Sequence, residues 1–286
     1  NIMIVGCPQM SNKKIFRYIH DFKLKNIFIW FDEAHHTIEK WVNRIDKREI
    51  NFFMNDNTKI SNRVFTSASP DIKCVEKYPY IFGEHYLPIT VKELISLSWL
   101  CPIKPYVYNN NINCVDICNY NLKNFKKFNS SFGFSFHNTR ENAFSLFEEH
   151  AHKYYKCETH IKPFLLVGND YTNDKLACWQ NMLKYDFRYI KEFELCNNSI
   201  GYVVQQYSIG YDFNKLDFMV FSDPKMSTKD IIQCIGRGTR PDKLGKNGTN
   251  LHKILKVMLP IFINDEIYED NDFNRIVGVL RYLIYD

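Results

Sequence analysis

Residues 28–36 read FIWFDEAHH, an apolar run that leads directly into two adjacent carboxylates, Asp32 and Glu33. A short apolar run bounded by polar residues is typical of a strand in a buried parallel sheet. Ligands of such sheets bind at the carboxyl ends of the strands. The stretch therefore predicts a strand at 26–31 with a site at its end. The alternative is a plain helix start, where carboxylates favour the helix dipole.

Outward from this stretch, short apolar runs alternate with longer amphipathic segments. We expect strands at 2–5, 26–31, 63–66, 103–108, 132–136, 164–168, 201–206, 217–221 and 254–263. We expect helices at 11–22, 37–54, 139–156, 172–185, 227–236 and 272–285. This alternation predicts an α/β fold built on parallel sheets.

Two prolines and a cluster of asparagines in the segment 99–112 indicate a domain boundary. A chain of 286 residues is long enough for about two domains. We therefore expect a partial first domain at 1–98 and a second at 99–264. Residues 265–286 would begin a C-terminal helical extension.

The composition is that of an ordinary globular protein, with 45% hydrophobic and 24% charged residues. A net charge of +5 is compatible with a polyanionic partner. The nine cysteines are irregularly spaced, which argues against a disulfide framework and for a reducing compartment. Because no apolar run approaches the ~18 residues of a membrane span, we expect no membrane partner and a cytoplasmic or nuclear, intracellular location.

Adjacent carboxylates point in different directions and can do different work. Mg²⁺ prefers oxygen ligands and keeps several waters while it bridges nucleotide phosphates. Asp32 would hold such a hydrated metal, and Glu33 would orient and deprotonate an attacking water. The pair therefore predicts phosphoryl-transfer chemistry with ATP and Mg²⁺.

Four sequence motifs together resemble those of a known protein family. They are DEAH at 32–35, TSASP at 66–70, YSIGYDF at 207–213 and QCIGRGTR at 233–240. In this order they resemble motifs II, III, V and VI of superfamily 2 DEAH/DEAD-box-type helicases and translocases. Large-virus and restriction-type members look most similar. The resemblance implies two RecA-like parallel-sheet lobes, the first incomplete, and a bridge with a short helix within 81–100.

The residues of the last motif, QCIGRGTR, also suit phosphate binding on chemical grounds alone. Arg237 and Arg240 can present planar, bidentate donors to phosphate oxygens, and we expect Gly236 to free a turn between them and Gln233. A surface basic patch at a helix end is the alternative. That alternative does not explain the fixed spacing of the glutamine and the glycine.

The resemblance implies that ATP binds between the lobes. Asp32 and Glu33 would come from the first lobe, and Gln233, Arg237 and Arg240 from the second.

Further roles follow from the same resemblance. His35 and the motif III residues Ser67 and Ser69 would couple ATP hydrolysis to movement of the lobes. Gly210 and Asp212 would lie near the ribose and the nucleic acid.

Residues 135–140, SFHNTR, look like motif IV, a strand that leads into a helix whose start can meet a phosphate. Thr139 and Arg140 would then contact nucleic acid. Simple helix capping by Asn138 or Thr139 is the alternative.

A phosphate loop of the form Gly-x-x-x-x-Gly-Lys-Ser/Thr is not found in the sequence. The nearest match, 238–247, has six residues between its glycines, and we reject it. In the family this loop lies upstream of DEAH, so we interpret the chain as a fragment that needs an upstream Walker A segment of the same polypeptide. We predict that the full protein is an ATP-dependent helicase and that residues 1–286 alone are inactive.

Three alternatives stay open. The protein could be a non-catalytic nucleic-acid-binding remnant that lost its phosphate loop. Its nucleic acid could be RNA, although DNA is favoured. A third reading is a zinc site, for which the candidate ligands are Cys114, Cys118, Cys157 and His160.

Overall fold

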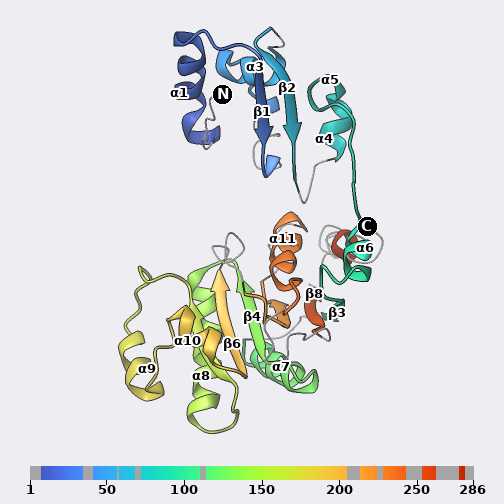
Figure 1. Cartoon of the computed structure of the whole chain (residues 1–286). Helices are drawn as coiled ribbons and strands as arrows, with labels where there is room; N and C mark the ends of the chain where they lie inside the picture. Colours follow the sequence, from blue (N-terminus) through green and yellow to red (C-terminus); the bar gives the residue numbers. More distant parts are fainter. Residues whose placement is uncertain are drawn as a thin grey trace, which may run out of the picture. The chain divides into compact units, whose positions relative to one another are not determined.

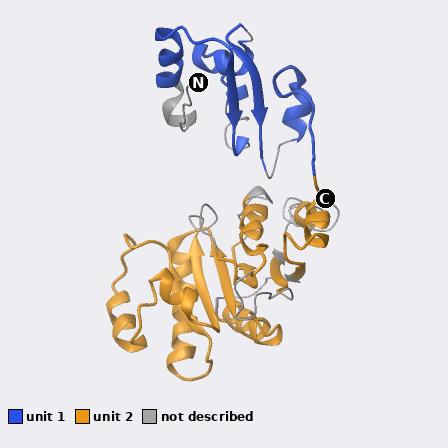
Figure 2. Ribbon diagram, viewed as in Figure 1, with its two compact units in different colours: residues 1–88 blue, residues 89–286 orange. Residues whose placement is uncertain are grey.

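The computed structural model describes residues 8–34, 41–56, 58–67, 72–109, 114–204, 213–223, 228–242, 253–261 and 277–280. The chain divides into two compact units, Asn1–Pro88 (unit 1) and Ile89–Asp286 (unit 2), coloured separately in Figure 2. The boundary expected from the sequence lies ten residues later, at 98. The helix α6 (Val91–Ser96) lies between the two positions and clusters with unit 2.

Unit 1 contains two parallel strands with helices around them (Figure 1). Its elements are α1 (Pro8–Asp21), β1 (Ile27–Phe31), α3 (Arg48–Asn55), β2 (Ile60–Phe65), α4 (Ile72–Lys77) and α5 (Pro79–Phe82). Its core is rich in aromatic side chains, among them Phe31, Trp41 and Phe53. Phe31 meets Trp41 edge-on, with ring centroids 5.7 Å apart.

The strand β1 differs from expectation in its surroundings. The sequence predicts a strand buried in the middle of a sheet, but among the described residues β1 pairs with β2 alone. Ile27, Ile29 and Phe31 face the core, whereas Phe28 and Trp30 are 60% and 64% exposed. The crossover helix α3 packs its apolar side chains into this core, so α1 and α3 cover only one face of the strand pair.

Unit 2 is built on a six-stranded sheet in the order β3-β8-β7-β4-β6-β5, in which every neighbouring pair is parallel. The strands are β3 (Ile103–Asn109), β4 (Phe132–His137), β5 (Lys162–Leu166), β6 (Ser199–Val204), β7 (Phe218–Phe221) and β8 (Leu255–Ile261). Besides α6, the helices are α7 (Cys114–Lys127), α8 (Arg140–Tyr155), α9 (Leu176–Leu183), α10 (Ile190–Leu195) and α11 (Thr228–Gly238).

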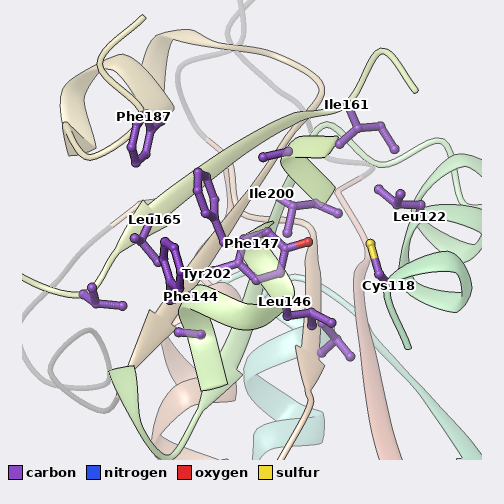
Figure 3. Packing of buried hydrophobic residues seen from close by; sticks show 14 of the residues in the cluster. Cys118, Leu122, Phe144, Leu146, Phe147, Ile161, Leu165, Phe187, Ile200 and Tyr202 are labelled. Atoms are coloured by element: carbon purple, nitrogen blue, oxygen red, sulfur yellow. The ribbon is translucent and has the colours of Figure 1, made fainter. Parts of the chain in front are cut away.

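Helices cover both faces of this sheet, so its strands are buried on both sides. Side chains from α7, α8 and α9 form one core with alternate residues of the strands, including Ile200 and Tyr202 of β6. Figure 3 shows Phe147 of α8 beside Tyr202 in that core. On the opposite face, Phe132, Phe134 and Phe136 of β4 pack with α10 and α11. The period of two along each strand produces this division.

The mixed α/β fold with parallel sheets is confirmed. The main error concerns α7, a 14-residue helix that the sequence analysis did not predict. Its sequence, CVDICNYNLKNFKK, contains asparagines that lower helix propensity. The helix forms because Cys118, Leu122 and Phe125 bury one side of it.

Smaller differences lie at element boundaries. The strand β2 begins at Ile60, three residues before the predicted start, and α9 covers only the middle of the predicted helix 172–185. The short helix implied within 81–100 is α6, which begins with a capping box between Thr90 and Glu93. The predicted strand 2–5 lies outside the described residues, as does most of the helix 272–285. Of the described helices, none has both the length and the apolar character that a membrane crossing requires.

Candidate functional site

The carboxyl ends of β1 and β2 bring two of the sequence motifs together. The strands pair in parallel with Phe31 opposite Phe65, so the residues that follow them are neighbours. The Thr66 amide donates to the Phe31 carbonyl at 2.9 Å, and the Ala34 amide donates to the Thr66 carbonyl at 2.9 Å. Asp32 and Glu33 therefore lie beside the start of the segment TSASP.

A hydroxyl joins the two motifs directly. Thr66 Oγ1 donates a hydrogen bond to Asp32 Oδ1 at 3.0 Å and accepts one from Trp30 Nε1 at 2.8 Å. The sequence analysis named Ser67 and Ser69 in this motif and missed Thr66. The sequence did contain a signal for Thr66. It is the first residue after β2, just as Asp32 is the first residue after β1.

Glu33 has an unusual backbone conformation, with φ of 47°. A glutamate in the left-handed region is uncommon, and strain of this kind, of order 1–3 kcal/mol, is concentrated at functional sites. The conformation gives the chain a sharp turn immediately after β1, and both Asp32 and Glu33 are exposed there. The exposed carboxylate of Asp32, oriented by Thr66, fits the outer-sphere binding of a hydrated Mg²⁺.

In unit 2, three predicted residues lie in or just after α11. Gln233 and Arg237 are half-buried and Arg240 is exposed, while Ile231, Ile232, Cys234 and Ile235 are buried. The spacing of four residues places Gln233 and Arg237 on one side of the helix, whereas Arg240 lies two residues beyond its end at Gly238. We expected a turn at Gly236, but the helix continues through it to Gly238. Gly236 borders open space, so its role as a turn is not supported.

The end of α11 packs closely on the sheet. A Cβ on Gly238 would lie 2.7 Å from Met219 Cε and 2.8 Å from Leu255 Cδ1, so a larger residue would require the ends of these two side chains to shift. The Thr239 hydroxyl donates to the Gly236 carbonyl at 2.9 Å, and the Cys101 amide donates to the Thr239 carbonyl at 2.7 Å.

Lys253 adds a contact that the sequence analysis missed. Its ammonium is buried and donates to the carbonyls of Asn214, at 2.5 Å, and Arg240, at 2.8 Å. Asn214 follows motif V, and Arg240 ends motif VI, so one side chain ties the two segments together. Nothing in the sequence near Lys253 signals this, because both acceptors are backbone atoms.

The predicted nucleic-acid contacts lie at the start of α8. Thr139 is the N-cap residue, and its hydroxyl accepts from the Asn142 amide at 3.1 Å. Arg140 Nη1 donates to Asp170 Oδ2 at 2.8 Å, and this hydrogen bond lowers the pKa of Asp170 below its usual value. The capping alternative is therefore observed for Thr139, while a contact of either residue with nucleic acid stays a prediction.

A buried polar chain lies just behind that helix start. Ser135 Oγ is 2.9 Å from His137 Nε2, and His137 Nδ1 is 3.6 Å from Asp223 Oδ1. Burial raises the pKa of Asp223, but its contacts with His137, Asn138 and Asn142 outweigh burial and leave that pKa below its ordinary value. The order serine, histidine, aspartate is that of a hydrolase triad. Ser135 is completely buried, so the chain serves structure rather than nucleophilic catalysis.

Four predicted site residues lie outside the described residues: His35, Ser69, Gly210 and Asp212. The candidate zinc ligands are partly described: Cys118 is buried in α7, whereas Cys157 and His160 are exposed. In the described segments, no three His, Cys, Asp or Glu side chains gather in a way that could hold a metal ion.

The sequence matches no protein-family model and no curated protein. Among solved structures, the ATP-dependent Type ISP restriction-modification enzyme LlaBIII bound to DNA is 16% identical, with a TM-score of 0.62 over 96% of this chain and 21% of that chain. A fragment described as an HsdR subunit of a type I restriction enzyme from Vibrio vulnificus YJ016 is 15% identical, with a TM-score of 0.51 over 86% of this chain and 46% of that one.

The likeness shows a shared fold: the parallel-sheet α/β architecture of this chain also occurs in these two restriction enzymes. Mycobacterium smegmatis helicase Lhr bound to ssDNA and AMP-PNP is also similar, at 14% identity and a TM-score of 0.47, which is too low to carry an argument. The chain spans about a fifth of the restriction-modification enzyme and less than half of the HsdR fragment. At these identities the likeness concerns the fold alone and not the activity.

Proposed function

We propose that this helicase core belongs to an ATP-dependent nucleic-acid helicase or translocase. The observation that carries the proposal is the hydrogen bond from Thr66 to Asp32, which joins the segments that resemble motifs II and III at one sheet edge. In a motor, a change at the nucleotide must reach the rest of the protein. A hydroxyl shared between the two segments is a direct route for that change.

The two units would contribute different groups to ATP hydrolysis. Asp32 would hold Mg²⁺ through water, and Glu33 would orient the attacking water and take its proton. Mg²⁺ bound there supplies positive charge next to the phosphates. From unit 2, Arg237 and Arg240 would stabilise the charge that develops on the γ-phosphate, with Gln233 beside them.

The remaining predicted site residues, some of which lie outside the described segments, complete the proposal. His35 and Ser69, with Ser67, would couple the units, and Gly210 and Asp212 would lie near the ribose. Thr139 and Arg140 would meet the nucleic-acid backbone.

The phosphate loop would come from an upstream segment of the same polypeptide. The exposed face of β1 supports this, because parallel sheets are normally covered on both faces and Phe28 and Trp30 are open. A βα unit added beside β1 would cover these side chains and place its loop at the edge where Asp32 lies. ATP and Mg²⁺ would then bind only to the completed protein.

DNA is favoured over RNA as the partner. The restriction-modification enzyme with the higher TM-score was solved bound to DNA, which supports this choice by analogy of fold. We further propose an intracellular location, cytoplasmic or nuclear, and keep a viral source as a hypothesis.

An ATPase assay tests the proposal. Residues 1–286 should not hydrolyse ATP measurably, whereas the protein extended by its phosphate-loop segment should do so and be stimulated by DNA. Glu33→Gln in the extended protein should lower kcat by about 10²–10⁴-fold, because it removes the general base. Activity that survives this substitution would contradict the role of Glu33.

The second candidate is a non-catalytic nucleic-acid-binding protein without a phosphate loop. The exposed side chains at the start of α8 suit this function as well as the first. The two candidates differ in their dependence on ATP: only a motor requires ATP to release DNA or to move along it.

A further inference from the structure

The outer side of α1 and the turn after it carry basic and aromatic side chains together. Lys14, Arg17, Tyr18, Phe22 and Lys25 are all exposed, and we name them the basic–aromatic strip. In Figure 1, α1 lies at one side of unit 1. Lys14, Arg17 and Tyr18 lie on α1, whereas Phe22 and Lys25 follow the end of the helix at Asp21, in a turn where Lys23 has φ of 50°.

The strip is not needed to hold α1 in place. Ile19 is 3% exposed and packs into the core of unit 1 together with Ile15 and Phe16. The ring of Phe16 meets that of Phe52 in α3 edge-on, at 5.1 Å between centroids. These apolar residues account for the docking of the helix, so the exposed aromatic residues call for another explanation.

Tyr18 and Phe22 form a pair at the surface. Their ring centroids are 4.4 Å apart at an interplanar angle of 36°, and the side chains are 42% and 61% exposed. Two large aromatic side chains that are exposed to water do not contribute the burial free energy that such side chains usually provide. Bases of single-stranded nucleic acid stack on platforms of this kind, with about 1–3 kcal/mol per base.

The local charge favours the same partner. Residues 13–25 contain five Lys or Arg and one Asp. The longest helix of unit 2, α8, has two Arg or Lys and three Glu in its 16 residues. The helix α7 carries three Lys and one Asp in 14 residues, so local positive charge is not unique to residues 13–25. The strip is distinguished by the exposed aromatic pair that lies beside its charges. A polyanion with exposed bases complements both properties of the strip.

We propose that the basic–aromatic strip binds single-stranded nucleic acid. The phosphates lie against Lys14, Arg17 and Lys25, and bases stack on Tyr18 and Phe22. This inference rests on the proposed nucleic-acid function and adds the surface of unit 1 that performs part of it. It requires neither ATP nor a phosphate loop, so residues 1–286 are sufficient for the test.

The experiment measures binding of a fluorescent 20-nucleotide oligo(dT) by anisotropy as a function of salt. Tyr18→Ala with Phe22→Ala should weaken binding by roughly tenfold or more, as expected for the loss of base stacking. Lys14→Gln with Arg17→Gln should weaken binding and reduce the slope of log K against log salt by about 1.4, or 0.7 for each lost charge.

Matched controls use exposed residues of unit 2. Tyr155→Ala removes a 55% exposed aromatic side chain from α8, and Lys175→Gln removes an exposed charge; both should bind like the unchanged protein. Thermal unfolding of every variant should stay close to that of the unchanged protein, because all the altered side chains are exposed.

The outcomes separate this inference from the proposed function. If the unchanged protein binds oligo(dT) and the strip variants bind equally well, the strip is not the site, while the nucleic-acid function stands. If the unchanged protein does not bind oligo(dT), the inference is wrong, while the proposed function is decided separately by the ATPase assay of the extended protein. If only the charge variants lose affinity, stacking is refuted. If the strip variants change the oligomeric state in light scattering without weakening binding, the strip is a protein interface and the inference is wrong.

Discussion

The two units hold their proposed catalytic residues in different ways. In unit 2 the end of α11 is fixed by the close packing of Gly238 and by Lys253, whose buried ammonium contacts two carbonyls. In unit 1 Asp32 is oriented by the hydroxyl of the half-buried Thr66, beside a strand pair on which Phe28 and Trp30 are exposed. The end of α11 is therefore held by several contacts inside unit 2, whereas one hydroxyl orients Asp32 in unit 1.

The largest effect should come from the core of unit 2. Phe147→Ala removes a completely buried ring that contacts Phe187 and Tyr202. We expect the free energy of unfolding to fall by about 3–5 kcal/mol, as for other large aromatic-to-alanine changes. Urea unfolding measures it. Trp30→Ala in unit 1 is the control, since its side chain is 64% exposed and its loss should cost far less. Equal losses would remove the contrast between the units.

Lys253→Met keeps the length of the side chain and removes the ammonium. The carbonyls of Asn214 and Arg240 lose a charged donor, and the free energy of unfolding should fall by roughly 1.5–3 kcal/mol. Lys256→Met is a matched control on the neighbouring strand, whose ammonium is half-buried beside Asp217 at 3.6 Å.

Hydrogen exchange measures the local result of the Lys253 change. The peptides that contain Asn214 and Arg240 should exchange faster in Lys253→Met than in Lys256→Met. Unchanged exchange in both peptides would show that Lys253 does not fix the end of α11.

Acid should weaken unit 2 through His150. Burial lowers the pKa of this histidine from 6.5 to about 3, and the hydrogen bond with the Ile161 carbonyl offsets only part of that shift. The Tyr202 hydroxyl lies 2.9 Å from His150 Nδ1. Between these two pKa values the histidine is protonated in the unfolded chain and neutral in the folded protein. The free energy of unfolding therefore falls as the pH falls below 6.5. From pH 7 to pH 5 we expect a loss of about 2 kcal/mol from this group.

Urea unfolding at several pH values measures this loss. His150→Gln should remove most of the pH dependence in that range, whereas replacement of the exposed His160 by Gln should retain it. A pH profile that is the same in all three proteins would refute the assignment.

The smallest effect on stability should come from Thr66→Val in unit 1. The change removes one hydroxyl from a half-buried residue, so we expect a loss of no more than about 1 kcal/mol. Its local consequence is larger, because Trp30 Nε1 loses its acceptor and Asp32 its donor. A change in tryptophan emission, with little change in unfolding, would support an exposed and lightly held site. Strong destabilisation would show that Thr66 is as deeply integrated as Lys253.

The sequence predicted the local elements that carry several of the candidate site residues. An apolar run that ends in Asp32 implied a parallel strand with carboxylates at its end, and β1 has that form. The sequence predicted a helix at 227–236 that contains Gln233, and α11 matches most of that range and continues to Gly238. Periodicity is a local property, so residues within one element can be assigned without knowledge of their neighbours.

Contacts between distant segments were not predictable in this way. Thr66 and Asp32 are 34 residues apart, and their hydrogen bond depends on the register between β1 and β2. Lys253 contacts backbone carbonyls, which every residue type offers equally. The helix α7 has poor local propensity and forms because its apolar side finds a core.

By itself, the amino-acid sequence determined the α/β alternation, the ordered motifs and the residue types that could handle a phosphate and its metal. The tertiary structure alone decided that Thr66 orients Asp32, that Lys253 secures Arg240, and that Tyr18 and Phe22 stand together in solvent. The physical reason is that hydrogen bonding and burial depend on distances between segments, and those distances exist only once the strands have paired and the helices have packed.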